Sequence, residues 1–566
     1  VLPKFFSVFH GFDVGEGEYT MTLVEQNIVK IVSEIRSKKR WNIKIKDPEI
    51  RAKWKQELLA NFNEKDIQFA LDECKYLAQD YAEGEKILEA VDGTFFADEY
   101  IPKSVLNQLI QAVEEFEKDT ENSQDWHPGS DQQVLDLVHP SLYSVINGVS
   151  RAVTKDLSPN ETDIMRSYMN LGAGSVDNLV FETDKDSRKR KWYDIVISDK
   201  FQWLPAEVDV DAEGNTKILS YINNLNPKKY GKLYTCIEQV LSHFVLIFSK
   251  VLTYSTEKYV SRQTPRIAPR TYYIESESEF ICRICKEENK PLKNKQDEDG
   301  DGDSDSDDGI YEIRERFCEE KLVIPPAEYL FSQQNINKPI DRVDLKGTRL
   351  QVIVKMANIC LTPEKPTYKG GVWHIEGMLN EDIVSTGIYY YHQENITESK
   401  LNFRKAIREP GYEQYDDLGV KLTYGLENEG ALNQFLGGVV THEGRCLSFP
   451  NRYQHQVQPF ELVDKTKPGV RKILCFFLVN PNNRVYSTAI VPPQQKEWYV
   501  EELNKNSSKL TNLPSLVLEN INKHMDWPIE RNDAEKYREQ LMAERKYLVN
   551  DQDGISFERQ FSLCEH

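Results

Sequence analysis

The sequence has little cysteine, an excess of negative charge and few long apolar segments. Its nine cysteines are scattered and odd in number, which excludes a disulfide framework and is typical of a reducing intracellular compartment. With 71 basic and 91 acidic side chains the formal net charge is -20, so no basic face for nucleic acid is expected. No apolar run approaches the roughly 20 residues of a membrane span. We therefore expect a cytoplasmic protein, with a nuclear location also open, that binds neither membrane nor nucleic acid.

Several catalytic signatures are also missing. The chain has no P-loop, no dinucleotide-binding glycine motif and no nucleophile elbow. Residues 1–20 lack the basic start, apolar core and cleavage site of a secretory leader, so we expect a terminal extension and no secretion. Met21 leaves open whether the native start lies inside the printed sequence, and no pattern indicates an oligomeric state.

Hydrophobic periodicity changes along the chain from helical to strand-like. Helical spacing predicts helices over 23–36, 50–62, 64–82, 103–118 and 233–254. An acidic turn separates 201–205 from 218–222, which predicts a pair of strands. The tract 296–309 is almost only Asp, Gly and Ser, and it predicts a disordered acidic loop.

The second half of the chain is rich in strand-like segments. Val, Ile, Tyr and Phe are concentrated in 350–359, 383–391, 437–449, 455–463 and 472–479, with turn residues between them. This density of strands fits an antiparallel jelly-roll barrel, so the predicted class is α+β. The predicted divisions are a terminal extension (1–20), a mainly helical region packing on the barrel (21–260), a connecting segment (261–345), the barrel core (346–495) and a helical C-terminal tail (496–566).

One His-x-acid pair stands out among three. One or two such pairs are expected by chance from ten histidines and 91 acids. The pairs at 392–394 and 524–526 fall in a polar loop and a helical region, whereas His374 and Glu376 lie between a Gly-Gly turn and an apolar segment. We expect them to lie on a strand, where residues i and i+2 point to the same face. His455 lies on a later strand-like segment. Two histidines and a carboxylate form the facial triad that holds non-haem Fe(II) and leaves positions open for oxygen and a co-substrate.

A cation follows on the next strand-like segment. Arg471 can grip a carboxylate with two hydrogen bonds, as the far end of a dicarboxylate co-substrate such as 2-oxoglutarate requires. Lys472 is the competing candidate, and strand alternation lets only one of the two point inward. The alternative interpretation of the whole pattern is two histidines at the edge of a core and a surface arginine.

Long motifs in a fixed order carry a resemblance to a known family. They are Gly-Gly-Val-Trp-His-Ile-Glu-Gly-Met-Leu-Asn at 370–380 and the segments 388–399, 449–455, 468–474 and 487–495, preceded by 125–131, 136–143 and 220–224. From about Met21 to Glu502 the sequence resembles the mainly fungal family named domain of unknown function 4246.

The barrel half of that family is similar to the 2-oxoglutarate- and Fe(II)-dependent oxygenases, which implies a cupin-like double-stranded β-helix. The resemblance implies metal positions for His374, Glu376 and His455 and a co-substrate position for Arg471. The sequence departs from the commoner oxygenase pattern by using Glu where Asp is usual. Its arginine also lies further from the last histidine than is common.

Other residues have weaker signals. Further candidates for the cofactor pocket are Tyr390, Arg445 and Asn451. Three cysteines flank the acidic tract: Cys282, Cys285 and Cys318. They could contribute to a structural zinc site, but no fourth ligand is close to them in sequence. The alternative is that they are free thiols. His127 and His139 lie in turns, where we expect structural hydrogen bonds and not metal binding.

The resulting functional hypothesis is an Fe(II)- and 2-oxoglutarate-dependent dioxygenase that uses O2 to hydroxylate a small-molecule or protein substrate. Two alternatives stay open. A zinc-dependent hydrolase can use the same His374, Glu376 and His455, although it gives no reason for Arg471. A non-catalytic jelly-roll binding protein would keep the fold without the chemistry.

Overall fold

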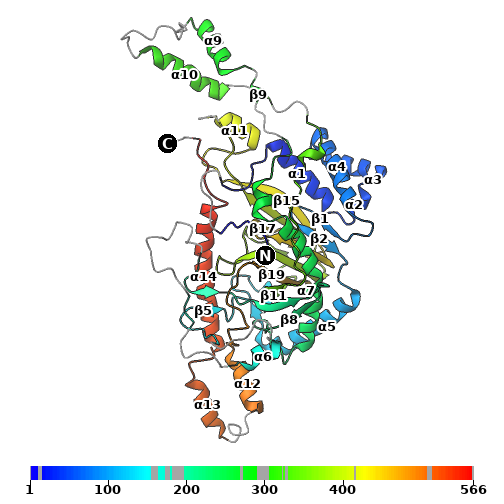
Figure 1. The fold of residues 1–566 in the computed structure, drawn as a ribbon, viewed down its shortest axis with the longest axis vertical. Helices are drawn as coiled ribbons and strands as arrows, with labels where there is room; N and C mark the ends of the chain where they lie inside the picture. Colours follow the sequence, from blue (N-terminus) through cyan, green and yellow to red (C-terminus); the bar gives the residue numbers. More distant parts are fainter. Residues whose placement is uncertain are drawn as a thin grey trace.

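Among the described residues, a ten-stranded antiparallel sheet and four smaller sheets are surrounded by helices (Figure 1). The computed structural model describes residues 2–9, 16–153, 163–171, 179–181, 197–267, 272–273, 275–289, 305–320, 323–324, 329–412, 416–506 and 513–563. In Figure 1, α9 and α10 project at one end, α12 and α13 lie at the other, and α14 runs along one side.

The predicted helices of the first half are present. Side chains of Thr22, Asp47 and Asn63 accept backbone N–H bonds at the starts of α1, α3 and α4, which satisfies amides that a helix start leaves free. The helices of the described residues are α1 (Leu23–Arg36), α2 (Trp41–Lys44), α3 (Pro48–Leu58), α4 (Glu64–Leu77), α5 (Lys103–Asp119), α6 (Ile164–Met169), α7 (Gly231–Thr253), α8 (Glu257–Ser261), α9 (Glu277–Glu287), α10 (Asp305–Glu320), α11 (Asp417–Tyr424), α12 (Lys496–Asn506), α13 (Ser515–Lys523) and α14 (Arg531–Ile555).

The main sheet combines strands from both halves of the chain. Its order is β1 (Ile87–Glu89), β2 (Phe95–Asp98), β16 (Arg445–Pro450), β13 (Ile383–Glu394), β19 (Gly469–Val479), β11 (Arg349–Leu361), β4 (Val134–Val138) and β3 (Asp125–Trp126). Beside β4, the other end of β11 pairs with β7 (Ala206–Val210), which pairs in turn with β8 (Thr216–Ile218). All these pairs are antiparallel.

The second sheet comes from the second half alone. Its strands are β15 (Asn433–Thr441), β14 (Ser399–Ala406) and β17 (Tyr453–Val457) in that order, and β12 (Thr367–Tyr368) pairs with β18 (Phe460–Glu461) beside them. Two further pairs are β5 (Val145–Ile146) with β6 (Phe201–Gln202), and β9 (Tyr272–Tyr273) with β10 (Val323–Ile324). One apolar cluster joins the two sheets: Ile388, Leu447 and Phe477 of the main sheet pack with Leu401, Phe403 and Leu436 of the second. The sheets therefore face each other across a common core.

Helix α7 covers the outer face of the main sheet. By length and composition it could cross a membrane, so the prediction that no such run exists was wrong. It is a core helix here, because most of its side chains are buried and Phe244 packs on Phe476 of β19 with ring centroids 5.4 Å apart. Gly387 of β13 permits this approach, since a Cβ there would lie 2.7 Å from the Phe244 ring.

The N-terminal region was predicted to pack on the barrel, and it also contributes strands to the main sheet. Strands β2, β4 and β7 extend the main sheet on both sides of its central strands. The predicted pairing of 201–205 with 218–222 was wrong, because β8 pairs with β7 and β6 pairs with β5. Pro205 has no N–H for a ladder, so the strand that meets β8 begins only after it.

The terminal extension and the acidic tract both contribute ordered structure. Within the predicted extension at 1–20, Phe5, Val8 and Phe9 are buried. Of the acidic tract, residues 296–304 lie outside the described residues. Helix α10 begins at Asp305, so the prediction of a loop was wrong for 305–309.

The C-terminal tail is helical as predicted, and α14 packs along the side of the molecule. Arg538 of α14 makes an ion pair with Asp125 at 2.7 Å. Arg545 forms an ion pair with the buried Glu381, and Gln552 donates to the carbonyl of Val8. The helix thus ties the two ends of the chain to the sheets.

Candidate functional site

His374, Glu376 and His455 converge although 79 residues separate the last two. His455 lies on β17, while His374 lies in the segment between β12 and β13 and forms one isolated bridge with it. The N–H of each histidine donates to the carbonyl of the other, at 3.2 and 3.0 Å. The prediction that His374 and Glu376 lie on a strand was therefore wrong. A single bridge to β17 positions the segment instead.

The three side chains have the arrangement of a metal site. Their ligand atoms lie within 4.8 Å of one another. Glu376 Oε1 lies 3.8 Å from His374 Nε2 and 3.4 Å from His455 Nε2. The His455 side chain is 4% exposed and that of His374 is 34% exposed, so the group is buried on one side and open on the other.

Hydrogen bonding prepares His374 as a ligand. Its Nδ1 lies 2.8 Å from the carbonyl oxygen of Val372, which can only accept, so Nδ1 carries the proton and Nε2 presents a lone pair. The His455 ring packs against Phe449 with centroids 4.7 Å apart, which fixes its orientation. Its Nδ1 is buried and has no hydrogen-bond partner among the described residues.

The pKa values follow from burial and mutual charge. Burial alone would raise the pKa of Glu376, but hydrogen bonds from His374 and His455 lower it well below its usual range. Burial lowers the pKa of His455 to about 4, helped by the charge of His374. Burial also acts to lower the pKa of His374, but the neighbouring Glu376 outweighs it and raises that pKa. An ionised carboxylate beside a neutral imidazole is a donor set that fits a divalent transition metal.

Asn451 holds the backbone of Glu376. Its Oδ1 accepts from the Glu376 N–H at 2.8 Å, and its Nδ2 donates to the carbonyls of Glu376 and Ile383 at 2.8 and 2.9 Å. The amide is thus fully used by the backbone. The prediction that Asn451 contacts a cofactor is replaced by a role in positioning the carboxylate.

Alternation on β19 separates the two candidate cations as expected. Lys472 makes a 2.8 Å ion pair with Glu117 of α5, on the outer side of the sheet. Arg471 is 2% exposed and lies over the rings of Phe460 and Tyr390, at 4.4 and 5.6 Å. Its polar contact among the described residues is with Gln393 Oε1 at 3.3 Å, and no carboxylate pairs with it there.

Two remaining pocket candidates differ in their surroundings. Tyr390 faces the core between the sheets, beside Arg471. Arg445 makes two hydrogen bonds to Asp98, at 2.7 and 2.8 Å, so its guanidinium is already paired. Burial would raise the pKa of Asp98, but hydrogen bonds from Arg445 and His442 lower it well below its usual range. Arg445 therefore joins β16 to β2, and its predicted contact with a cofactor is replaced by this ion pair.

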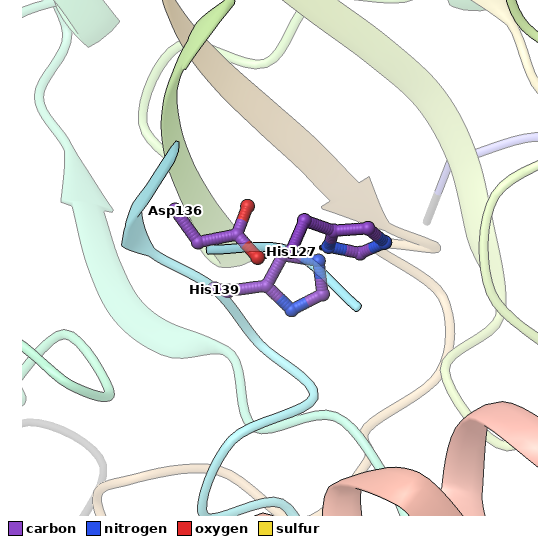
Figure 2. Close-up of side chains that lie close together, drawn as sticks. All are labelled: His127, Asp136 and His139. Atoms are coloured by element: carbon purple, nitrogen blue, oxygen red, sulfur yellow. Dashed lines mark hydrogen bonds and ion pairs between the residues drawn. The ribbon is translucent and has the colours of Figure 1, made fainter. Parts of the chain in front are cut away.

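A second cluster was not foreseen as a possible metal site. His127, Asp136 and His139 lie around the β3–β4 hairpin, with ligand atoms within 4.8 Å of one another (Figure 2). His127 Nδ1 lies 2.8 Å from Asp136 Oδ2, and the other Asp136 oxygen is buried with no partner among the described residues. Asp136 and His139 also border a cavity of about 650 Å³. Both histidines precede a proline and Asp131 and Asp136 lie between them, which was the available sequence signal.

The second cluster differs from the first in its hydrogen bonding. The backbone N–H of Ser141 donates to His139 Nδ1 at 3.2 Å, so the proton of the neutral ring sits on Nε2. Burial lowers the pKa of His139 to about 3, which keeps the ring neutral. Nε2 then donates a hydrogen bond instead of a lone pair, and this makes His139 a poor metal ligand. His127, Asp136 and His139 are a candidate His-Asp-His site by residue type and spacing only.

Of the two interpretations of Cys282, Cys285 and Cys318, the described residues favour free thiols over a zinc site. Cys282 and Cys285 are free thiols on α9, and Cys285 is buried in the small apolar core between α9 and α10. The side chain of Cys318 lies outside the described residues.

Three solved structures share distant similarity with this chain. They are the Fe(II)/α-ketoglutarate-dependent dioxygenase TqaL (11% identity, 41% of this chain and 88% of that chain, TM-score 0.17), a BsmA homologue from Methylobium petroleophilum PM1 (13%, 24% and 43%, TM-score 0.14) and IDO from Bacillus thuringiensis (12%, 28% and 67%, TM-score 0.14). Similarities of this degree assign neither fold nor activity to this chain. No curated protein matches it significantly.

The family match is extensive. "Protein of unknown function (DUF4246)" matches residues 64–502, and "Domain of unknown function DUF4246, N-terminal" matches residues 4–57. The match reaches further toward the N-terminus than the resemblance that begins near Met21. The chain belongs to the DUF4246 family.

Proposed function

We propose that this chain is an Fe(II)- and 2-oxoglutarate-dependent dioxygenase with His374, Glu376 and His455 as the metal ligands. The observation that carries the proposal is their convergence, from distant parts of the sequence, with a carbonyl that fixes the His374 proton on Nδ1. Ligating histidines usually donate their other ring N–H in this way. The second cluster lacks this feature at His139, which favours the first as the iron site.

The strand order supports a jelly-roll, or double-stranded β-helix, as the frame of this site. In the main sheet the central order is β16-β13-β19-β11, and in the second it is β15-β14-β17, with β18 and β12 beside it. Along the second half the chain thus passes repeatedly between the main sheet (β11, β13, β16 and β19) and the second sheet (β12, then β14 with β15, then β17 with β18), as in a jelly roll. The metal ligands lie between β12 and β13 and on β17, and the cation lies near the start of β19.

When bound, iron and 2-oxoglutarate would let O2 convert the co-substrate to succinate and CO2, with the second oxygen atom entering a C–H bond of the substrate. The chain's residues bind and orient. Arg471 holds the far carboxylate of 2-oxoglutarate. Its guanidinium is suited to this role because no carboxylate among the described residues already pairs with it. Tyr390 lies beside it, with its ring centre 5.6 Å from the Arg471 guanidinium. Asn451 keeps the Glu376 backbone fixed, so that the carboxylate does not swing away from the imidazoles.

The C-terminal helix covers one side of the site. Asp553 of α14 accepts from Gln454, the neighbour of His455, at 2.6 Å. Glu558 just beyond α14 pairs with Arg404 of β14 at 2.7 Å, and that guanidinium lies 5.0 Å from the Trp373 ring centre. These contacts hold the end of α14 against the sequence neighbours of His374 and His455.

The test is anaerobic titration of Fe(II)-loaded protein with 2-oxoglutarate. Binding is detected by the weak visible charge-transfer band that appears when a 2-oxo acid chelates iron. We expect the band in the wild-type protein, its loss in His374→Ala and a higher 2-oxoglutarate requirement in Arg471→Ala. Metal binding without a band would refute the proposal and favour a zinc hydrolase, which uses the same donor set. Failure to bind any metal would favour a binding protein without catalysis.

The substrate class is a further part of the proposal. The net charge of -20 disfavours nucleic acid, which would be repelled by an acidic surface. We propose hydroxylation of a small molecule or of a protein side chain.

A further inference from the structure

Lys355 faces the interior between the two sheets. One row of directly opposed residues crosses four neighbouring strands of the main sheet. In order, it consists of Lys355 on β11, Cys475 on β19, Ile388 on β13 and Leu447 on β16. Residues directly opposite on neighbouring strands share a face. The other three members of this row belong to the apolar cluster between the sheets. The Lys355 side chain therefore points into the same interior as the proposed iron ligands.

No described residue pairs with this ammonium group. Among the described residues, neither a hydrogen bond nor an ion pair involves Lys355, although it is not surface-exposed. The charges of Asp136 and Glu376 both act on Lys355, so its ammonium group lies near both clusters. An ammonium has three donors, and on half-buried Lys355 they are available to an anionic ligand.

Arg471 is a second interior cation at a different level. Arg471 stands opposite Ile359, four residues beyond Lys355 on β11, so both side chains share the inner face. Four strand residues correspond to about 13 Å along the sheet. Tyr368 interacts with both cations, but their other electrostatic partners differ: Lys355 acts on His374, Glu376 and His455, whereas Arg471 acts on Tyr390. Lys355 is thus the cation beside the proposed metal ligands, and Arg471 lies further along the sheet.

We infer that Lys355 binds the carboxylate of 2-oxoglutarate that lies next to the metal, while Arg471 binds the far carboxylate. This inference rests on the proposed function. A dicarboxylate carries one negative charge at each end, which complements one cation near Glu376 and one further along the barrel. Lys355 is then the residue that recognises the 2-oxo acid end, which every 2-oxo acid shares.

The experiment compares two 2-oxo acids on Fe(II)-loaded protein without oxygen, by the charge-transfer band and by calorimetry. 2-Oxoglutarate has both carboxylates, and pyruvate has only the one beside the ketone. Lys355→Met should weaken binding of both by about 10- to 100-fold, as expected for loss of a charged hydrogen bond. Arg471→Met should weaken 2-oxoglutarate alone. Lys472→Met, on the outer face of the sheet, is the matched control and should change neither.

Two checks keep the outcomes separate. Iron binding by Lys355→Met shows that the variant is folded, and Lys355→Arg should recover much of the lost affinity because it restores a cation. Wild-type affinity of Lys355→Met for both acids would overturn the inference, as would a loss confined to 2-oxoglutarate. A wild-type protein that binds iron but shows no band would instead remove the proposed function, and this inference with it.

Discussion

Asn451→Ala should loosen iron binding although Asn451 is no ligand. The substitution removes three hydrogen bonds, to Glu376 N–H, Glu376 C=O and Ile383 C=O, all between 2.8 and 2.9 Å. At about 1 kcal/mol each, their loss should lower the free energy of unfolding by about 3 kcal/mol. Because the backbone that carries the Glu376 carboxylate is then free to shift, iron affinity should fall by about 10- to 100-fold. Urea denaturation and anaerobic iron titration measure the two effects.

The matched control is Asn223→Ala. Asn223 is also buried and its amide also makes three hydrogen bonds, to Leu142 O, Tyr143 O and Gln495 Nε2, but away from the triad. It should lose similar stability and keep wild-type iron affinity. Equal iron affinity in the two variants would refute the claim that Asn451 acts by positioning Glu376.

Three further predictions test the site, the ion pairs and the packing. His139→Gln should leave the iron stoichiometry unchanged and His374→Gln should abolish binding, as measured by metal analysis after gel filtration; loss of iron in His139→Gln would contradict the tautomer argument. The folded-state pKa of Asp98 is lowered, so its stabilising ion pair is fully present above about pH 4 and is lost as the pH falls further. Asp98→Asn should therefore be less stable than the wild-type protein at pH 7. Its stability should also depend less on pH below about pH 4, as urea denaturation can measure. Gly387→Ala should cost about 1–3 kcal/mol by crowding α7, whereas Gly231→Ala, where a Cβ meets nothing within 4 Å, should not, as thermal denaturation can check.

The long elements of the fold could be predicted because each carries its own pattern. Strand β11 covers the predicted 350–359, and α7 covers nearly all of the predicted 233–254. The short strands could not be predicted in the same way. Strand β2 is four residues long and pairs with β16, more than 340 residues later, so its stability comes from a partner that local sequence does not reveal. The N-terminal region was called mainly helical for this reason.

The convergence of His374, Glu376 and His455 could be predicted from the sequence, but the residues that position them could not. Histidine is scarce in this chain, and the family motifs contain these three residues in a fixed order. That Asn451 serves the backbone is invisible in sequence, because its partners are N–H and C=O groups that every residue has. Arg445 looked free for the same reason, since Asp98 lies far away in sequence.

The two histidine clusters show why donor type alone does not identify a metal centre. Both contain two imidazoles and one carboxylate within 4.8 Å, so residue type and spacing rank them equally. The difference lies in one backbone contact on each ring. A carbonyl faces His374 Nδ1 and leaves Nε2 free to coordinate, whereas an N–H faces His139 Nδ1 and leaves the proton on Nε2. For His139 to coordinate through Nε2, it would have to give up the Ser141 hydrogen bond or lose a second proton, and His374 has neither cost.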